Sequence, residues 1–385
     1  MADPSFIPFA LPDVGDAEAE AVAATIRSGW VTSGPTMRAF EDDFVDFVGG
    51  AVEAVAVNSA TAGLHLALEA IGVGPGDEVI VPTWTFTATA EVVRYLGATP
   101  VIVDVEPDTL NIDLNAVAGA VTPATRAVIP VHFAGLPVDL RALRAAVGAD
   151  DIRIIEDAAH ALPAVGPDGF VGTASASDAA VFSFYATKTI TTGEGGMITT
   201  RDPDVAARCR VMRLHGIDRD AFDRYTSDKP SWAYDVVAPG YKYNMPDTAA
   251  AMGRVQLARS HQMRLRRQKI AERYATQFAD LPVQLPASAP AGCVHSWHLY
   301  VVRLRDGGPG RDDFIRAMSE WGIGTSVHFI PLHEHSYWRR FVPEADSSLP
   351  VAVSEGPRAV SLPIYSGMTD DQVGRVCEAV TAVLT

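Results

Sequence analysis

The fold is most clearly indicated by residues 182–189, which read FSFYATKT, and by residues 192–198, which read TGEGGMI. The apolar run at 179–184 predicts a buried strand that ends in a turn of small residues carrying Lys188. A glycine-rich bend then leads into a second strand. Burial of the Lys188 amine would lower its pKa and make it a nucleophile toward carbonyl groups. The alternative is a lysine at a strand end that extends its amine to water.

Short apolar runs alternate with helical segments from residue 51 to about residue 200. Continuous Val and Ile runs separated by helices indicate a mostly parallel sheet covered on both faces. In such α/β folds, ligands bind at the carboxyl ends of the strands. We expect seven strands, at 52–57, 78–81, 100–103, 127–131, 153–155, 179–184 and 197–199.

The chain has 385 residues, which is long for one core, so two domains are expected. We place the boundary in a long helical segment at 247–278. Residues 1–250 then form a large α/β domain and residues 251–385 a smaller α+β domain. Within that segment, the basic run 254–273 is interpreted as a solvated helix face. Other expected elements are helices at 16–28, 36–48, 203–215, 312–321, 351–358 and 369–384, and strands at 298–304 and near 325–329.

Composition limits the class of protein. The net charge of −16 argues against nucleic acid or an acidic membrane surface as a partner. The three cysteines lie far apart and fit neither a disulfide nor a metal spacing, which indicates a reducing compartment. The sequence shows no signal peptide and no apolar stretch of membrane-spanning length. We therefore expect a cytoplasmic protein.

The first candidate site follows the first expected strand. Residues 57–64 read VNSATAGL, so small hydroxylated residues precede a helix. The free N–H groups of a helix N-terminus, with the hydroxyls of Ser59 and Thr61, suit a phosphate. Either hydroxyl could instead only cap the helix. The sequence lacks the dinucleotide glycine fingerprint and the phosphate-loop motif, so NAD and ATP are poor candidates.

Two further strand ends carry aromatic and acidic residues. Residues 82–89, PTWTFTAT, open a helix with two aromatics, one of which could lie flat on a planar ring or pack in the core. Residues 154–161, IIEDAAHA, place Asp157 and His160 just past a buried strand. A carboxylate there could keep a heteroaromatic nitrogen protonated, or it could cap a short helix.

Three further stretches lie outside this pattern. The loop 28–35 carries Trp30 and is either a plain helix connection or a substrate-facing loop. The aromatic-rich segment 222–243 is too long for a simple connection and is expected to be functional. Residues 323–338 contain His328, His333 and His335, whose spacing is not that of a zinc protease. We expect polar substrate contacts or surface histidines there, and no metal.

The strand-end stretches together match the needs of one cofactor. Pyridoxal phosphate requires a lysine that forms a Schiff base, an acid for its pyridine nitrogen, an aromatic for its ring face and hydroxyls for its phosphate. No motif is specific alone. Four of them at the strand ends of one α/β domain predict this cofactor.

The chain also resembles the DegT–StrS family of nucleotide-sugar aminotransferases, which are fold-type I pyridoxal-phosphate enzymes. The resemblance covers nearly the whole chain. It includes GWVTSGP at 29–35, DEVIVP at 77–82, EDAAH at 156–160, residues 183–196, GYKYNM at 240–245 and SLP at 361–363. Within the family, residues 241–244 and 322–329 look most like the branch that aminates UDP-linked 4-keto pentoses.

The resemblance implies roles for individual residues. Lys188 would be the lysine that bonds the cofactor, and Asp157 the partner of its pyridine nitrogen. Phe86 would stack on the ring, and His160 would lie beside it. The phosphate contacts would come from Ala60, Thr61 and Ser183, with Ser59 adjoining them.

The resemblance also implies a homodimer with shared active sites. In the family, an Asn of a Gly-Tyr-Asn-Tyr-Arg stretch reaches the phosphate bound by the neighbouring subunit. Here Lys242 stands at that position, and Asn244 stands where the family has Arg. A lysine can still bind phosphate, so the kind of contact is retained.

The expected reaction is transfer of an amino group from L-glutamate, which leaves as 2-oxoglutarate, to a 4-keto nucleotide sugar. A dTDP-4-keto-6-deoxyhexose is the preferred substrate, with a UDP-4-keto-pentose or a 3-keto nucleotide sugar as alternatives. Candidate substrate residues are Trp30, Tyr185, Lys229 and His328, with Arg219 and Lys242 near the diphosphate.

Two functions of other classes stay open, and a third is disfavoured. A cofactor-sensing regulator would need a DNA-binding region, and only about fifty residues precede the first strand. A lyase or racemase would keep Lys188 and Asp157 but act without a sugar. Family dehydratases carry a histidine at the position of Lys188, which argues against them.

Overall fold

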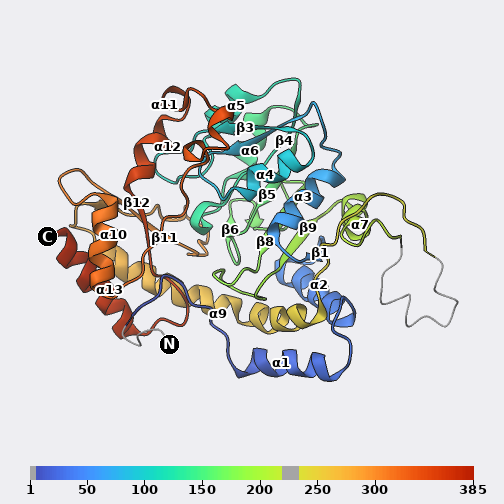
Figure 1. Ribbon diagram of the computed structural model, residues 1–385, viewed down its shortest axis with the longest axis horizontal. Helices are drawn as coiled ribbons and strands as arrows, with labels where there is room; N and C mark the ends of the chain where they lie inside the picture. Colours follow the sequence, from blue (N-terminus) through green and yellow to red (C-terminus); the bar gives the residue numbers. More distant parts are fainter. Residues whose placement is uncertain (1–5, 219–233) are drawn as a thin grey trace.

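The computed structural model describes residues 6–218 and 234–385. Its centre is a seven-stranded sheet in the order β1-β9-β8-β5-β4-β2-β3 (Figure 1). Strand β9 runs antiparallel to both neighbours, and the other pairs are parallel. The mostly parallel seven-stranded α/β sheet predicted from the sequence is confirmed. The strands are β1 (Glu53–Val57), β2 (Glu78–Pro82), β3 (Thr99–Val103), β4 (Thr125–Val128), β5 (Arg153–Asp157), β8 (Ala179–Ser183) and β9 (Gly196–Thr200).

Helices cover both faces of this sheet, which explains why its strands are apolar on both sides. Successive strand residues point to opposite faces, so Val55 and Val57 enter one core layer and Ala54 and Ala56 the other. The first layer is closed by α3 (Ala60–Ala70), α4 (Ala88–Tyr95) and α7 (Pro203–Met212). The second is closed by α2 (Pro35–Val48), α5 (Leu114–Ala120), α6 (Leu140–Val147) and α9 (Asp247–Gln277).

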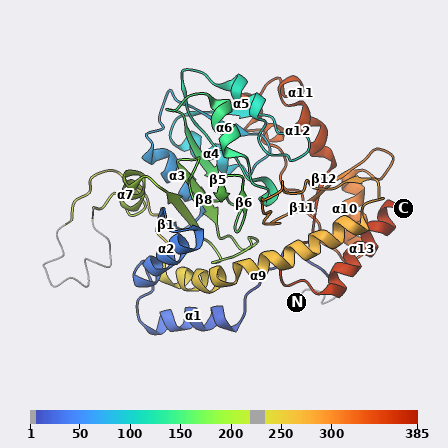
Figure 2. The ribbon, with the colours of Figure 1, turned by 180° about the vertical axis from the view of Figure 1, so that it is seen from behind.

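Helix α9 runs along the length of the molecule in both views (Figures 1 and 2). Its first part packs against α1 (Asp16–Arg27) and α2, and its last part against the C-terminal core. The predicted domain boundary at 250/251 lies within α9, and the two-domain division stays a prediction. The interpretation of the basic run as a solvated face is wrong for Arg267, whose side chain is 3% exposed. A basic run along a helix does not reveal which turn another element covers.

The C-terminal part contains an antiparallel sheet of β10 (Val283–Gln284), β11 (Tyr300–Leu304) and β12 (Ala359–Leu362). Helices α10 (Arg311–Glu320) and α13 (Asp370–Leu384) pack on it. The strand expected near 325–329 is wrong: Ser326 makes one bridge to Ser361, and the chain then turns toward the large sheet. Shorter elements are β6 (Val165–Gly166), β7 (Gly169–Phe170), α11 (Ala345–Ser348), α12 (Pro350–Glu355) and the 3-10 turns η1 (Phe133–Gly135), η2 (Leu332–Glu334), η3 (Arg339–Phe341) and η4 (Gly356–Arg358).

Two features complete the description. The N-terminal arm joins the C-terminal part, because Ile7 forms a parallel bridge with Ile323. Among the described helices, none combines the length and apolar character needed to cross a membrane.

Candidate active site

The carboxyl ends of β1, β2, β5 and β8 open into one cavity of about 610 Å³. These four strands point the same way, so the turns that follow them meet at one edge of the sheet. Nine residues singled out in the sequence line this cavity: Ala60, Thr61, Phe86, Asp157, His160, Ser183, Tyr185, Lys188 and His328.

Lys188 lies in the turn after β8, where its backbone N–H donates to the Tyr185 carbonyl at 2.9 Å. The residue as a whole is half-buried, and protein atoms surround its amine. Burial lowers the pKa of Lys188 from 10.5 to about 8, although the negative charge of Asp157 raises it. The amine is therefore partly neutral near pH 8, as a nucleophile or a general base requires.

Asp157 is the last residue of β5 and its side chain is 6% exposed. One carboxylate oxygen accepts a hydrogen bond from the Thr89 hydroxyl at 2.8 Å, and the other accepts from the Ala159 backbone N–H at 3.2 Å. Burial raises the pKa of Asp157, while these hydrogen bonds and the charge of Lys188 act in the opposite direction. Thr89 was missed in the sequence, although it lies one helical turn after Thr85 in the quoted stretch 82–89.

Three histidine rings crowd the same end of the cavity. His160 and His298 lie 4.3 Å apart between ring centroids, and the His298 Nε2 atom is 3.5 Å from the Lys188 amine. Burial, with the charge of Lys188, lowers the pKa of both rings well below their usual range. The same causes lower the pKa of His328 to about 4. Burial therefore favours the neutral form of all three rings.

Each of these rings keeps a buried Nδ1 atom without a hydrogen-bond partner among the described residues. A buried polar atom without a partner costs free energy, so an unpaired ring nitrogen in a lined cavity indicates a polar ligand. His298 was not predicted from the sequence, because it precedes a strand of the other sheet. Phe9 was missed too, and its ring stacks on His328 at 4.8 Å.

The residues present fit pyridoxal phosphate. A primary amine and a buried carboxylate lie in one cavity with the N-terminus of α3, whose backbone N–H groups suit a phosphate. Ala60, Thr61 and Ser183 line that end of the cavity. Ser59 does not line it: its hydroxyl caps α3 by accepting from the Ala62 N–H at 3.1 Å. When bound, the cofactor withdraws electrons from the reacting carbon of the substrate.

Other predicted residues lie elsewhere. Trp30 does not line this cavity, and its indole N–H donates to the Ser33 carbonyl at 3.1 Å. Lys242 and Asn244 do not line it either, and the Lys242 amine donates to the Asn244 side-chain oxygen at 2.5 Å. Lys229 and Arg219 fall outside the described residues.

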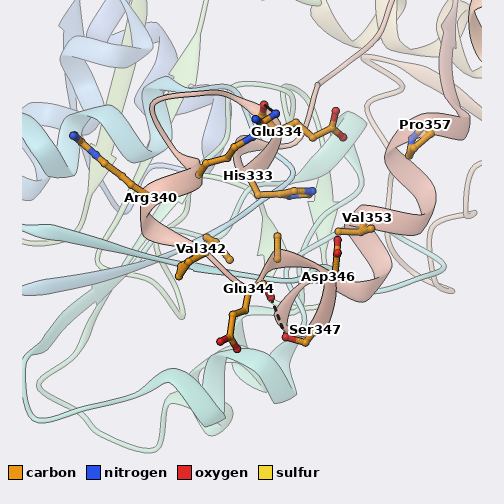
Figure 3. Close-up of a pocket in the computed structure, with 12 residues that line it drawn as sticks. His333, Glu334, Arg340, Val342, Glu344, Asp346, Ser347, Val353 and Pro357 are labelled. Atoms are coloured by element: carbon orange, nitrogen blue, oxygen red, sulfur yellow. Dashed lines mark hydrogen bonds between the residues drawn. The ribbon is translucent and has the colours of Figure 1, made fainter.

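A second hollow, of about 790 Å³, lies over η2, η3, α11 and α12 (Figure 3). His333 projects into it, and the His333 Nδ1 atom is 2.9 Å from the Thr83 hydroxyl. Its charged lining mixes Glu334, Glu344 and Asp346 with two arginines. It shares no lining residue with the Lys188 cavity, so the predicted histidine stretch serves two separate surfaces.

A lysine held beside a carboxylate at the ends of a mostly parallel sheet places the protein among the fold-type I pyridoxal-phosphate enzymes. The sequence profile of the DegT/DnrJ/EryC1/StrS aminotransferase family matches residues 12–381, and the chain belongs to this family. It is a pyridoxal-phosphate-dependent sugar aminotransferase.

Similar proteins cover nearly the whole chain. The spore coat polysaccharide biosynthesis protein SpsC of Bacillus subtilis (strain 168) is 45% identical over 382 residues, or 98% of this chain and 97% of that protein. The solved structure of Spr1654 from Streptococcus pneumoniae in its PMP form is 34% identical, covers 98% of each chain and has a TM-score of 0.90. The sugar aminotransferase CalS13 from Micromonospora echinospora is 32% identical over 98% of this chain and 99% of that chain, with a TM-score of 0.85.

Proposed function

We propose that the protein transfers the amino group of L-glutamate to C4 of a 4-keto sugar carried on a nucleoside diphosphate. The observation that carries this proposal is the lining of the Lys188 cavity. Besides the amine and Asp157, it includes two exposed aromatic side chains, Phe86 and Tyr185. Its volume is within the range of small-molecule sites.

Lys188 is the general acid–base residue in the proposed reaction. Its amine, with a pKa of about 8, would act as the general base that takes the proton from the Cα of glutamate and later returns it. Asp157 would hold the ring nitrogen of the cofactor protonated, and Thr61 and Ser183 would hold its phosphate. The same groups then act in the opposite sense on C4 of the sugar.

The preferred sugar is a 4-keto-6-deoxyhexose on dTDP, and a UDP-linked 4-keto sugar is the second choice. The resemblance around residues 322–329 and 29–35 supports amination at C4. The resemblance gives less support to the identity of the sugar, because one extra carbon in a substrate changes the selectivity of an apolar pocket by only about 10- to 200-fold.

The proposal includes a homodimer whose sites are shared. Lys242 and Asn244 lie outside the cavity of their own chain, as residues that reach a neighbouring subunit would. Large apolar side chains are exposed a few residues before them: Tyr234, Val236 and Val237 are each at least half exposed. Such surfaces are commonly covered by a partner.

A panel of nucleotide keto sugars, each with L-glutamate, tests the substrate. We expect dTDP-4-keto-6-deoxyglucose to give an amino sugar whose nitrogen NMR places at C4, with 2-oxoglutarate in equal amount. Amination of 3-keto isomers alone would refute the C4 assignment. Turnover of amino acids without any sugar would instead favour a lyase or racemase, and binding of the cofactor without turnover would favour a regulator.

A further inference from the structure

His298 lies next to Lys188 although it comes from the other sheet. It precedes β11 by two residues, its side chain is 5% exposed, and its Nε2 atom is 3.5 Å from the Lys188 amine. It lines the same cavity as Asp157. The two residues therefore approach the amine from different parts of the chain.

The segment 295–298 is fixed on the large sheet by several hydrogen bonds. The Ser296 N–H donates to the Gly135 carbonyl at 3.1 Å, and the Ser296 hydroxyl donates to the His160 carbonyl at 2.5 Å. Gly135 has φ of 98°, and a Cβ atom there would lie 1.9 Å from the Ser296 hydroxyl oxygen. Only glycine allows this close approach without displacing the segment.

Arg267 holds the same segment from the side of α9. Its guanidinium donates to the carbonyls of Trp297 and His298, at 3.3 Å each, and to the Ile364 carbonyl at 2.7 Å. All three carbonyls accept from the same nitrogen, Nη1, so this one buried group joins the segment to α9 and to the C-terminal part. The His298 backbone is thus held from both sides, which limits where its ring can go.

The electrostatic surroundings keep the His298 ring neutral. The ionisable groups around it are Lys188, His160 and His328 in the cavity, with Arg267 behind it and Asp157 beyond the amine. Burial, with the positive charges of Lys188 and Arg267, lowers the pKa of His298. A neutral ring can accept one hydrogen bond, and Nε2 is the nitrogen that faces the amine.

We propose that His298 is a positioning residue for Lys188: its Nε2 accepts a hydrogen bond from the lysine amine whenever that amine is not bonded to the cofactor. The hydrogen bond aims the amine and favours its protonated form, so it opposes part of the desolvation caused by burial. This inference rests on the proposed role of Lys188, but it does not depend on which sugar is the substrate.

The test reads the Lys188 amine directly. Protein loaded with pyridoxamine phosphate has this lysine free, and acylation by acetic anhydride over a pH series, followed by mass spectrometry, gives the apparent pKa of Lys188. We expect His298→Leu and His298→Asn to lower that pKa by about one unit, the effect of losing one hydrogen bond to a charged group. His298→Gln, whose amide reaches the place of Nε2, should keep the wild-type value. Turnover of the Leu and Asn variants should fall in kcat, with KM for the sugar little changed.

His295→Leu is the matched control. His295 is buried in the same segment and stacks on Trp297 at 4.0 Å between ring centroids, and the Lys188 cavity does not include it. An unchanged Lys188 pKa in His298→Asn overturns the proposal, as does an equal fall in His298→Gln or in His295→Leu. If His298→Leu does not fold, the Asn and Gln pair decides. The outcomes that overturn the proposal are all read from the Lys188 pKa and not from sugar turnover, so failure of the proposed substrate is seen separately.

Discussion

Replacing Asp157 with asparagine tests the electrostatic centre of the site. Asparagine has nearly the same shape, so its oxygen can still accept from the Ala159 N–H and its NH₂ can donate to the Thr89 hydroxyl. The Thr89 hydroxyl can turn toward Thr85, whose oxygen is 2.6 Å away. We therefore expect the free energy of unfolding to change by less than about 1 kcal/mol.

Turnover should respond far more strongly. Asp157 is 6% exposed, so solvent screens its charge little, and the variant has no charge to keep the cofactor's ring nitrogen protonated. We expect the barrier to rise by at least about 2.7 kcal/mol, which is a hundredfold loss in kcat. The assay is the single-turnover rate with L-glutamate, followed by the absorbance of the bound cofactor, alongside urea unfolding.

Asp104→Asn is the control for loss of a buried carboxylate elsewhere. Asp104 is 5% exposed and accepts from the backbone N–H groups of Val351 and Ala352 near the start of α12. The Asp104→Asn enzyme should be less stable than the wild type and should keep the wild-type turnover number. An Asp157→Asn enzyme that is folded, saturated with cofactor and within about threefold of wild-type kcat would show that Asp157 serves only its local hydrogen bonds.

Two further predictions concern Lys188 and the second subunit. Lys188→Met should stabilise the cofactor-free protein by up to about 3 kcal/mol near pH 7, because the lysine pKa falls from 10.5 to about 8 on folding. Below the pKa of the folded protein, the buried amine is charged and lowers stability. The advantage of methionine should therefore shrink as pH rises from about 8 to 10.5. Urea unfolding of both proteins over this pH range measures the difference, and a gain in stability that is independent of pH contradicts the prediction. For the dimer, mixing Lys188→Ala with Lys242→Ala subunits should restore some activity, since one site per heterodimer keeps both lysines. Subunits that exchange without rescue would place Lys242 outside the shared site, provided that Lys242→Ala alone is inactive.

The sequence was most informative where structure follows from local pattern. The Val and Ile runs predicted all seven strands of the large sheet, because a strand buried on both faces has no polar alternation. The rule that ligands gather at carboxyl ends then brought four separate stretches to one edge. Nine of the predicted residues line the cavity found there.

Residues that depend on tertiary placement were not predictable. His298 reaches Lys188 only because the segment before β11 crosses onto the large sheet. Arg267 lies in a basic run typical of a solvated helix, and only the fold shows that the C-terminal part covers this turn. Ser59 shows the converse limit, since a cap and a phosphate ligand can use the same hydroxyl: its oxygen caps α3, and its contact with a phosphate stays a prediction.

The opposite pKa shifts of Lys188 and Asp157 explain why the site needs both residues. Burial alone favours the neutral form of each group, since it lowers the pKa of the lysine and raises that of the carboxyl. In the protein without cofactor, each is the other's counter-charge. A protonated ring nitrogen beside Asp157 would provide the carboxylate with a closer partner and would remove the need for a charged lysine. Lys188 is then free to stay neutral, as its part in bond formation and proton transfer requires. With the cofactor bound, Asp157 would balance the charge of the ring nitrogen, and Lys188 would be left for bond formation and proton transfer. This is why Asp157→Asn should affect chemistry more than folding.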